Sequence, residues 1–228
     1  MITCSINQPY FFPYFGYFCL LAKSDIFISL DNVSMIKKGY IHRNSILLNG
    51  KEYKFTIPLK KISQNRQICE TYTTNYMEFY SKFAAIVELA YSKSPYYEQV
   101  LQLVEGIKFS DDVKISDLAE QSIQSVTSML ELPVKKLRSS DTLQNGGPGQ
   151  DRIISLCKSV GANQYLNLTS GRNLYNESEF DRHGLRLKFL DLNFKKYDRF
   201  ISTNGSYASI LDTLARFSKD DVREIITS

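Results

Sequence analysis

Apolar and polar positions along the chain predict an α/β protein that opens with a strand running into a rigid loop. Residues Ile2–Asn7 alternate in polarity, and Pro9 and Pro13 follow. Residues Tyr14–Lys23 are apolar almost throughout, which is typical of a short buried helix. The apolar run Ile26–Leu30 then ends at polar residues, as a buried strand does. A strand, a helix and a strand in this order predict a parallel pair joined by a crossover helix.

The middle of the chain predicts a hairpin and then helices. Two strand-like segments, Tyr40–Leu48 and Glu52–Pro58, flank Asn49-Gly50, a pair that favours a two-residue hairpin turn. A third strand is predicted at Gln67–Thr73. Helical spacing with few breakers follows in three segments, Glu78–Ser92, Pro95–Gly106 and Val113–Leu130.

The last third alternates strands and helices again, after the strongest loop signal in the chain at Asn145–Gly149. Strands are predicted at Pro133–Ser139, Gln164–Leu168 and Leu185–Leu190, and helices at Asp151–Val160, Glu177–His183 and Tyr207–Phe217. We therefore expect a single α/β domain over residues 1–228, with a mainly parallel Rossmann-like sheet and a helical insertion at about 75–130.

Composition narrows the class of protein. The chain has 228 residues, with 43% hydrophobic and 23% charged, which is ordinary for a globular protein. No apolar run is long enough for a membrane span, and no signal peptide is evident, so we expect a cytoplasmic protein whose four cysteines are reduced. The formal net charge of +4 is spread out, without the dense basic stripe of a nucleic-acid binder. We expect no nucleic-acid partner, no metal and no tightly bound cofactor.

The loop after the first strand is the first candidate site. In an open α/β sheet, ligands bind where a strand ends and a helix begins. The polar tips of Gln8, Tyr14 and Tyr17 therefore have a reason to face a crevice, with Gly16 allowing close backbone approach. The alternative is that the aromatic residues of this segment only pack the first helix.

Residues Pro13–Tyr17 resemble the proline-containing HxGH signature of Rossmann-like nucleotidyltransferases, with Tyr14 and Tyr17 in place of both histidines. In that family the histidines stabilise phosphate groups in the transition state. Tyrosine donates a hydrogen bond but carries no positive charge near neutral pH. The resemblance thus implies a related fold and argues against adenylyl transfer.

A second candidate site follows the second strand. Asp31 at the strand end is a candidate general base or ligand of a sugar hydroxyl, and the alternative is a capping aspartate. His42 could titrate near neutral pH as a base, although a lone histidine in a strand is often incidental. Arg43 has the planar fork that clamps a phosphate, or it forms a surface ion pair. Asn44 is a candidate hydrogen-bond donor.

A third candidate is the turn after the strand Gln164–Leu168. A strand followed by Ser170, Gly171 and Arg172 predicts a turn whose backbone N–H groups and arginine grip a phosphate. A generic loop is the alternative.

Several ordered blocks together resemble the WbqC-like family through nearly the whole chain, and the central helices contribute least. The blocks are QPYFFPYFGYF, SDIFISLDNV, HRNSI, FTIPL, DRIISLCKSVGANQYLNLTSGRNLY, EFDRHGLRLKFL and SYASILD. Such proteins are typically encoded among bacterial O-antigen genes. The resemblance implies transfer of an acyl or aminoacyl group to a nucleotide-linked 4-amino-4,6-dideoxyhexose, from a thioester on an acyl-carrier protein or coenzyme A.

In that reaction Asp31 or His42 is the expected base, and Gln8, Tyr14 or Asn44 donates to the oxyanion. Arg43 and Arg172 are expected to hold phosphates. Ser170, Gly171 and Tyr17 are expected to contact the substrate. Two other classes remain open. One is a nucleotidyl or phosphoryl transferase, which would consume a nucleoside triphosphate. The other is a non-catalytic module that binds nucleotide sugars.

Overall fold

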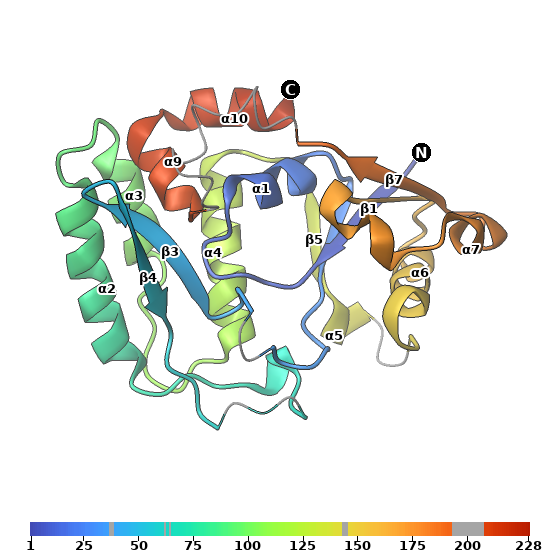
Figure 1. Ribbon diagram of the computed structural model, residues 1–228, viewed down its shortest axis with the longest axis horizontal. Coiled ribbons are helices and arrows are strands. Elements are labelled where there is room, and N and C mark those ends of the chain that lie inside the picture. The colour runs from blue at the N-terminus through green and yellow to red at the C-terminus, as the bar shows by residue number, and fades with distance from the viewer. Residues whose placement is uncertain (37–38, 62, 64, 143–145, 193–207) are drawn as a thin grey trace. The chain divides into compact units, whose positions relative to one another are not determined.

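A computed structural model describes residues 1–36, 39–61, 63, 65–142, 146–192 and 208–228 (Figure 1). The chain divides into two compact units. Unit 1 comprises Met1–Gln8, Gly16–Asn32 and Pro133–Asn193. Unit 2 comprises Pro9–Phe15, Val33–Leu132 and Phe194–Ser228. The two units have different architectures.

Unit 1 is built on a five-stranded sheet of order β5-β2-β1-β6-β7 in which every neighbouring pair is parallel. The strands are β1 (Thr3–Asn7), β2 (Ile26–Ser29), β5 (Lys135–Arg138), β6 (Gln164–Leu168) and β7 (Arg186–Leu190). The predicted parallel pair at the start of the chain is confirmed, since Cys4 lies opposite Ile26 in parallel register. The Rossmann-like α/β class is likewise confirmed.

Helices pack on both faces of this sheet because successive strand residues alternate in direction. Ile6 and Ile28 point to the face covered by α6 (Gly149–Ser159) and α7 (Glu177–Arg182), where Phe180 is fully buried. On the other face α1 (Phe15–Ala22) packs Tyr17 against Phe27, with ring centroids 5.3 Å apart. Unit 1 also contains the short helix α5 (Ser139–Thr142) and the 3₁₀ helix η2 (Thr169–Leu174).

Unit 2 combines one hairpin with a group of helices. Strands β3 (Arg43–Leu48) and β4 (Lys51–Thr56) pair antiparallel, as the Asn-Gly signal predicts. Asn49 and Gly50 have φ values of 52° and 74°, the left-handed conformation that a type I′ turn needs. The helices are η1 (Ile68–Glu70), α2 (Tyr76–Tyr91), α3 (Tyr97–Glu105), α4 (Ile115–Met129), α9 (Ile210–Arg216) and α10 (Lys219–Thr227).

The core of unit 2 contains a cluster of phenylalanine rings. Phe55 lies 4.8 Å from Phe83 between centroids, and Phe79 stacks on Phe83 at 5.6 Å. Phe11 and Phe12 join this cluster from the loop between β1 and α1, and both are fully buried. Their rings therefore belong to the hydrophobic core and do not face a ligand.

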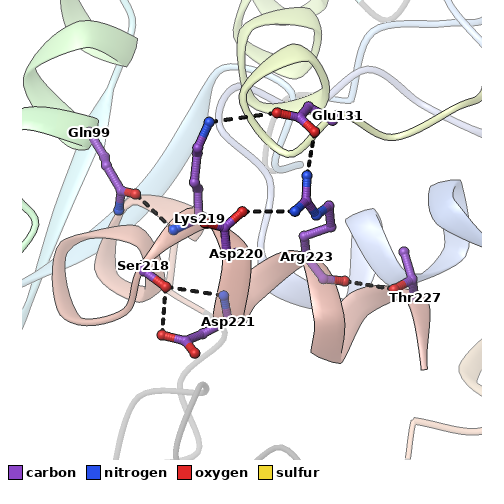
Figure 2. Close-up of polar contacts among 8 residues, drawn as sticks. All are labelled: Gln99, Glu131, Ser218, Lys219, Asp220, Asp221, Arg223 and Thr227. Atoms are coloured by element: carbon purple, nitrogen blue, oxygen red, sulfur yellow. Dashed lines mark hydrogen bonds and ion pairs between the residues drawn. The ribbon is translucent and has the colours of Figure 1, made fainter.

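Polar contacts fasten α10 to neighbouring helices (Figure 2). Arg223 bonds to Glu131 just beyond α4 and to Asp220 at 2.8 Å, and the backbone N–H of Lys219 donates to the Gln99 side chain at 2.7 Å. Beneath these contacts, Val222 and Ile226 are buried. The helix thus has one apolar face in the core and a charged face outside.

Two sequence expectations for unit 2 are wrong in detail. Gln67–Thr73 is not a strand, because its centre forms the 3₁₀ helix η1 and only isolated bridges join its ends to other segments. The last predicted helix starts at Ile210, and α10 follows it without having been predicted. None of the helices in the described ranges is both long and apolar enough to cross a membrane.

Candidate functional site

The carboxyl edge of the sheet in unit 1 has the geometry of a ligand site. From β1 the chain adds β2 and β5 on one side, and it then crosses to add β6 and β7 on the other. The strand order therefore reverses between β1 and β6, and such switch points are where open α/β sheets bind ligands. Gln8 follows β1 at this edge, and Thr169–Leu174 follows β6. Within unit 1, Gln8 and the turn that carries Ser170 and Arg172 thus lie at the same edge of the sheet.

Gln8 is the polar side chain nearest the end of β1. It is partly buried, and its side-chain amide makes no hydrogen bond to any residue that the structure describes. Its carbonyl oxygen accepts a hydrogen bond from the Tyr17 hydroxyl at 3.2 Å. Tyr17 itself is fully buried, so it positions the backbone of Gln8 and does not reach a ligand.

Asp31 follows β2 at the same edge and is fully buried. Both of its carboxylate oxygens accept hydrogen bonds from the start of α5. Oδ1 accepts from the backbone N–H of Ser140 at 2.9 Å and from the Ser139 hydroxyl at 3.1 Å, and Oδ2 accepts from the Ser140 hydroxyl at 2.8 Å. These contacts favour the capping alternative, because a carboxylate occupied in this way joins β2 to β5 rather than standing ready as a base.

A network beside Asp31 was not predicted from the sequence. The Ser139 hydroxyl accepts from the backbone N–H of Asp31 at 3.0 Å and also contacts Oδ1 of Asn32 at 2.7 Å. The same Asn32 oxygen accepts from Nη1 of Arg152 at 2.8 Å. The only sequence signal for Arg152 is its position just after the glycine-rich loop that opens α6.

The turn after β6 has a tightly packed base. Ser170 and Arg172 are exposed, and the Arg172 guanidinium lies 4.5 Å from the centroid of the Phe189 ring. A Cβ atom at Gly171 would lie 2.9 Å from the Asn167 side chain, so only glycine fits without a shift. Asn167 in turn donates to the Tyr175 hydroxyl at 3.1 Å. The turn therefore presents Ser170 and Arg172 from a fixed backbone.

The other predicted site residues belong to unit 2. Asn44 is buried, and its side-chain amide nitrogen donates to the carbonyl oxygens of Phe11 at 3.1 Å and Phe12 at 2.6 Å. The backbone N–H groups of Phe11 and Phe12 bond to Ile41 and Ser122. Phe12 has φ 43°, an uncommon value for a residue other than glycine. Asn44 thus holds the loop conformation, and both its amide hydrogens are already used.

His42 is buried next to Asn44, and its Nδ1 atom has no hydrogen-bond partner in the part of the chain that the structure describes. Burial, and then the charge of Arg43, lower the pKa of His42 to about 4. The imidazole is therefore neutral at pH 7. A neutral imidazole of such low pKa is a weak base.

Arg43 and Tyr14 are both partly buried. Nε of Arg43 donates to the carbonyl oxygen of Gly39 at 3.3 Å. Tyr14 pairs with Ser209 in an isolated antiparallel bridge at the start of α9. Within unit 2, His42, Arg43 and Asn44 are thus consecutive residues with different environments, and only Asn44 has a complete set of partners.

Asp212, in the block SYASILD, is a buried carboxyl group to which the sequence assigned no role. Its Oδ1 accepts hydrogen bonds from the Tyr91 hydroxyl and from the backbone N–H of Leu47. Burial raises the pKa of Asp212 to about 6, against the lowering effect of those two hydrogen bonds and of Arg216. This group connects α9, α2 and β3 inside unit 2.

No group of three or more histidine, cysteine, aspartate and glutamate side chains has a metal-binding arrangement among the described residues. Besides the hydrogen-bonded carboxylate of Asp31, the polar groups at the edge of unit 1 include an amide, hydroxyls and arginines, which are donors that suit hydroxyl and phosphate groups.

Comparison with known protein families gives one match. Residues 8–224 match the model of the WbqC-like protein family. A curated relative, the uncharacterized protein Rv1507c of Mycobacterium tuberculosis (strain ATCC 25618 / H37Rv), is 23% identical over 216 residues, which cover 94% of this chain and 93% of the relative. No solved structure matches the chain.

Proposed function

Because the chain belongs to the WbqC-like protein family, we propose that it is a cytoplasmic transferase of bacterial O-antigen and lipopolysaccharide synthesis. It transfers an acyl or aminoacyl group to the amine of a nucleotide-linked 4-amino-4,6-dideoxyhexose. The donor is a thioester carried by an acyl-carrier protein or by coenzyme A.

One observation supports this proposal most directly. Gln8 at the end of β1 and the turn after β6 lie on either side of the switch point of a Rossmann-like parallel sheet. This position is where such sheets bind nucleotides. Gln8, Ser170 and Arg172 supply polar groups there that suit a phosphorylated sugar.

The chemistry asks for little beyond positioning. The lone pair of the neutral sugar amine attacks the thioester carbonyl carbon and forms a C–N bond. The C–S bond then breaks, the donor leaves as a thiol, and the nitrogen loses one proton to give an amide. Holding the two reactants in line supplies most of the acceleration, and one donor to the oxyanion supplies more.

Gln8 is our candidate for that donor, because its side-chain amide is not engaged by other described residues. Asp31, with both oxygens hydrogen-bonded, is proposed to hold the end of β2 in place. Arg172 is proposed to contact phosphate. The catalytic role of His42 and the binding roles of Tyr14 and Arg43 stay predictions.

The test is an assay of amide formation with a nucleotide-linked 4-amino-4,6-dideoxyhexose and glycyl or acetyl thioesters. We expect product from the wild-type protein. Replacing Gln8 by Ala should lower kcat roughly 100-fold, the cost of losing one oxyanion donor. Gln124→Ala, on the exposed face of α4, is the matched control and should leave kcat unchanged.

The same assay includes Asp31→Asn and His42→Ala. Full activity in both variants would exclude Asp31 and His42 as the base. Full activity in Gln8→Ala would contradict the proposed site. Release of pyrophosphate from ATP or CTP would instead indicate a nucleotidyltransferase.

A second candidate function is binding of a nucleotide sugar without turnover. It is favoured by the state of the two candidate bases, since both carboxylate oxygens of Asp31 accept hydrogen bonds and His42 is buried with a low pKa. Micromolar binding of the nucleotide sugar, with no amide formed from any thioester, would support this function.

A further inference from the structure

Arg152 is a cation that unit 1 holds at the carboxyl edge of its sheet. It lies in the first turn of α6, the helix that follows β5 and leads to β6. Because β5 and β6 are parallel to the rest of the sheet, the first turn of this helix lies at the edge where the strands end. Its contact with Asn32, just beyond β2, places it at the same edge.

Neutral oxygen atoms orient the guanidinium group. Nη1 of Arg152 donates to the backbone carbonyl of Asn32 at 3.2 Å and to its side-chain oxygen at 2.8 Å, and Nε donates to the carbonyl of Gly147 at 3.1 Å. In the described part of the chain no carboxylate lies within ion-pair distance of this arginine, and Nη2 has no acceptor. Among the described residues, the positive charge is therefore held in one direction and meets no opposite charge.

The support behind Arg152 is rigid. Asn32 is buried, and its amide nitrogen donates to the carbonyl oxygen of Ser139 at 3.1 Å. Ser139 is fully buried and bonds to the backbone N–H of Asp31. A guanidinium group held in this way has already lost much of the side-chain freedom that binding would otherwise cost.

We infer that Arg152 binds the diphosphate group of a nucleotide ligand at the carboxyl edge of unit 1. The two Nη2 hydrogens, which no acceptor in the described part of the chain uses, are charge-assisted donors for an anion, and the positive end of the α6 dipole acts in the same direction. The inference rests on the proposed nucleotide-linked substrate. A nucleotide sugar and coenzyme A both carry a diphosphate, and the test separates these two sources.

The experiment measures binding by isothermal titration calorimetry with the full chain. The probes are the diphosphates of uridine, thymidine and guanosine, and coenzyme A, with uridine as the phosphate-free comparison. Replacing Arg152 by Gln should weaken binding of the diphosphate probe at least tenfold, since it removes a charge-assisted donor. Arg152→Lys, which keeps the charge and loses the planar guanidinium group held by Asn32 and Gly147, should fall between. Nucleoside binding should not change.

The matched control is Arg186→Gln, an exposed arginine on β7. It should bind each probe as the wild type does, and thermal unfolding checks that each variant is folded. If Arg152→Gln loses affinity only for the nucleoside diphosphates, the ligand of Arg152 is the nucleotide sugar. If it loses affinity only for coenzyme A, the ligand is the donor. Both results support the inference.

Two results would overturn it. One is that folded Arg152→Gln binds every diphosphate within twofold of the wild type. The other is that the wild type binds none of them at millimolar concentration. If Arg152 proves essential for binding while no amide is formed in the transfer assay, the proposed reaction fails and the assignment of Arg152 stands.

Discussion

At the scale of single residues, Asp212 shows that burial can affect a pKa more strongly than hydrogen bonding does. Its carboxylate accepts from Tyr91 and Leu47, and these bonds favour the charged form. Burial has the larger effect and raises the pKa to about 6, and Oδ2 has no partner in the part of the chain that the structure describes. The folded protein therefore takes up a proton at Asp212 at a higher pH than the unfolded chain does.

This difference predicts how stability depends on pH. Between about pH 4 and pH 6 the folded state binds more protons at Asp212, so its contribution to the free energy of unfolding falls as pH rises and is flat above pH 6. In Asp212→Asn this contribution is absent. The free energy of unfolding of the variant, minus that of the wild type, should therefore rise by roughly 3 kcal/mol between pH 4 and pH 7. Urea unfolding at each pH measures both values.

Asp181→Asn is the control for that series, because Asp181 is exposed. Its difference from the wild type should stay constant over the same range. A constant difference for Asp212→Asn as well would show that this carboxyl group has an ordinary pKa in the folded protein.

At the scale of elements, α10 separates the effect of apolar packing from that of surface ion pairs. Ile226 is 1% exposed, whereas the Glu131 side chain that bonds to Arg223 is 60% exposed (Figure 2). Ile226→Ala should therefore lower the free energy of unfolding by roughly 2 kcal/mol or more. Glu131→Gln should lower it by less than about 1 kcal/mol. Chemical denaturation at 25 °C measures both.

The salt dependence supplies the check. Glu131→Gln should approach the wild type as salt is added, because exposed ion pairs are screened. Equal losses for the two variants would mean that charge, and not burial, attaches α10.

Local signals account for the elements that the sequence predicted and for those it missed. Alternation and an Asn-Gly pair are sufficient for the β3–β4 hairpin. In contrast, the apolar face of α10 is short, with Val222 and Ile226 as its buried residues, and its first turn is charged, so this helix was not predicted from the sequence. Gln67–Thr73 looks like a strand, but the Glu70 carboxylate accepts from the backbone N–H of Gln67 and favours a helical turn.

At the scale of the whole molecule, the position of the candidate site residues at strand ends could be predicted from the sequence, whereas most of their contacts could not. Strand ends followed by polar residues were enough to place Gln8, Asp31 and Arg172 at one edge of a parallel sheet. Their partners come from distant segments. Ser140 binds Asp31 across 109 positions, and Arg152 binds Asn32 across 120, so no local pattern could reveal them.

Thiol reactivity tests the burial of side chains throughout the chain. Cys4, Cys19 and Cys157 are at most 2% exposed, and Cys69 is partly exposed. A hydrogen bond with Cys4 and burial raise the pKa of Cys157 well above its usual value. Ellman's reagent should therefore modify one thiol in the native protein and four in guanidinium chloride. Rapid reaction of more than one native thiol would contradict this burial.

The order of strands in unit 1 has a consequence for synthesis on the ribosome. Strand β1 is synthesised long before one of its two neighbours, β6, which starts at Gln164. Until that residue emerges, one side of β1 has no strand to pair with, and an open edge invites association with other chains. Because the closing contact joins such remote positions, we expect the sheet to form late in translation and the unpaired edge of β1 to stay open to other chains during that interval.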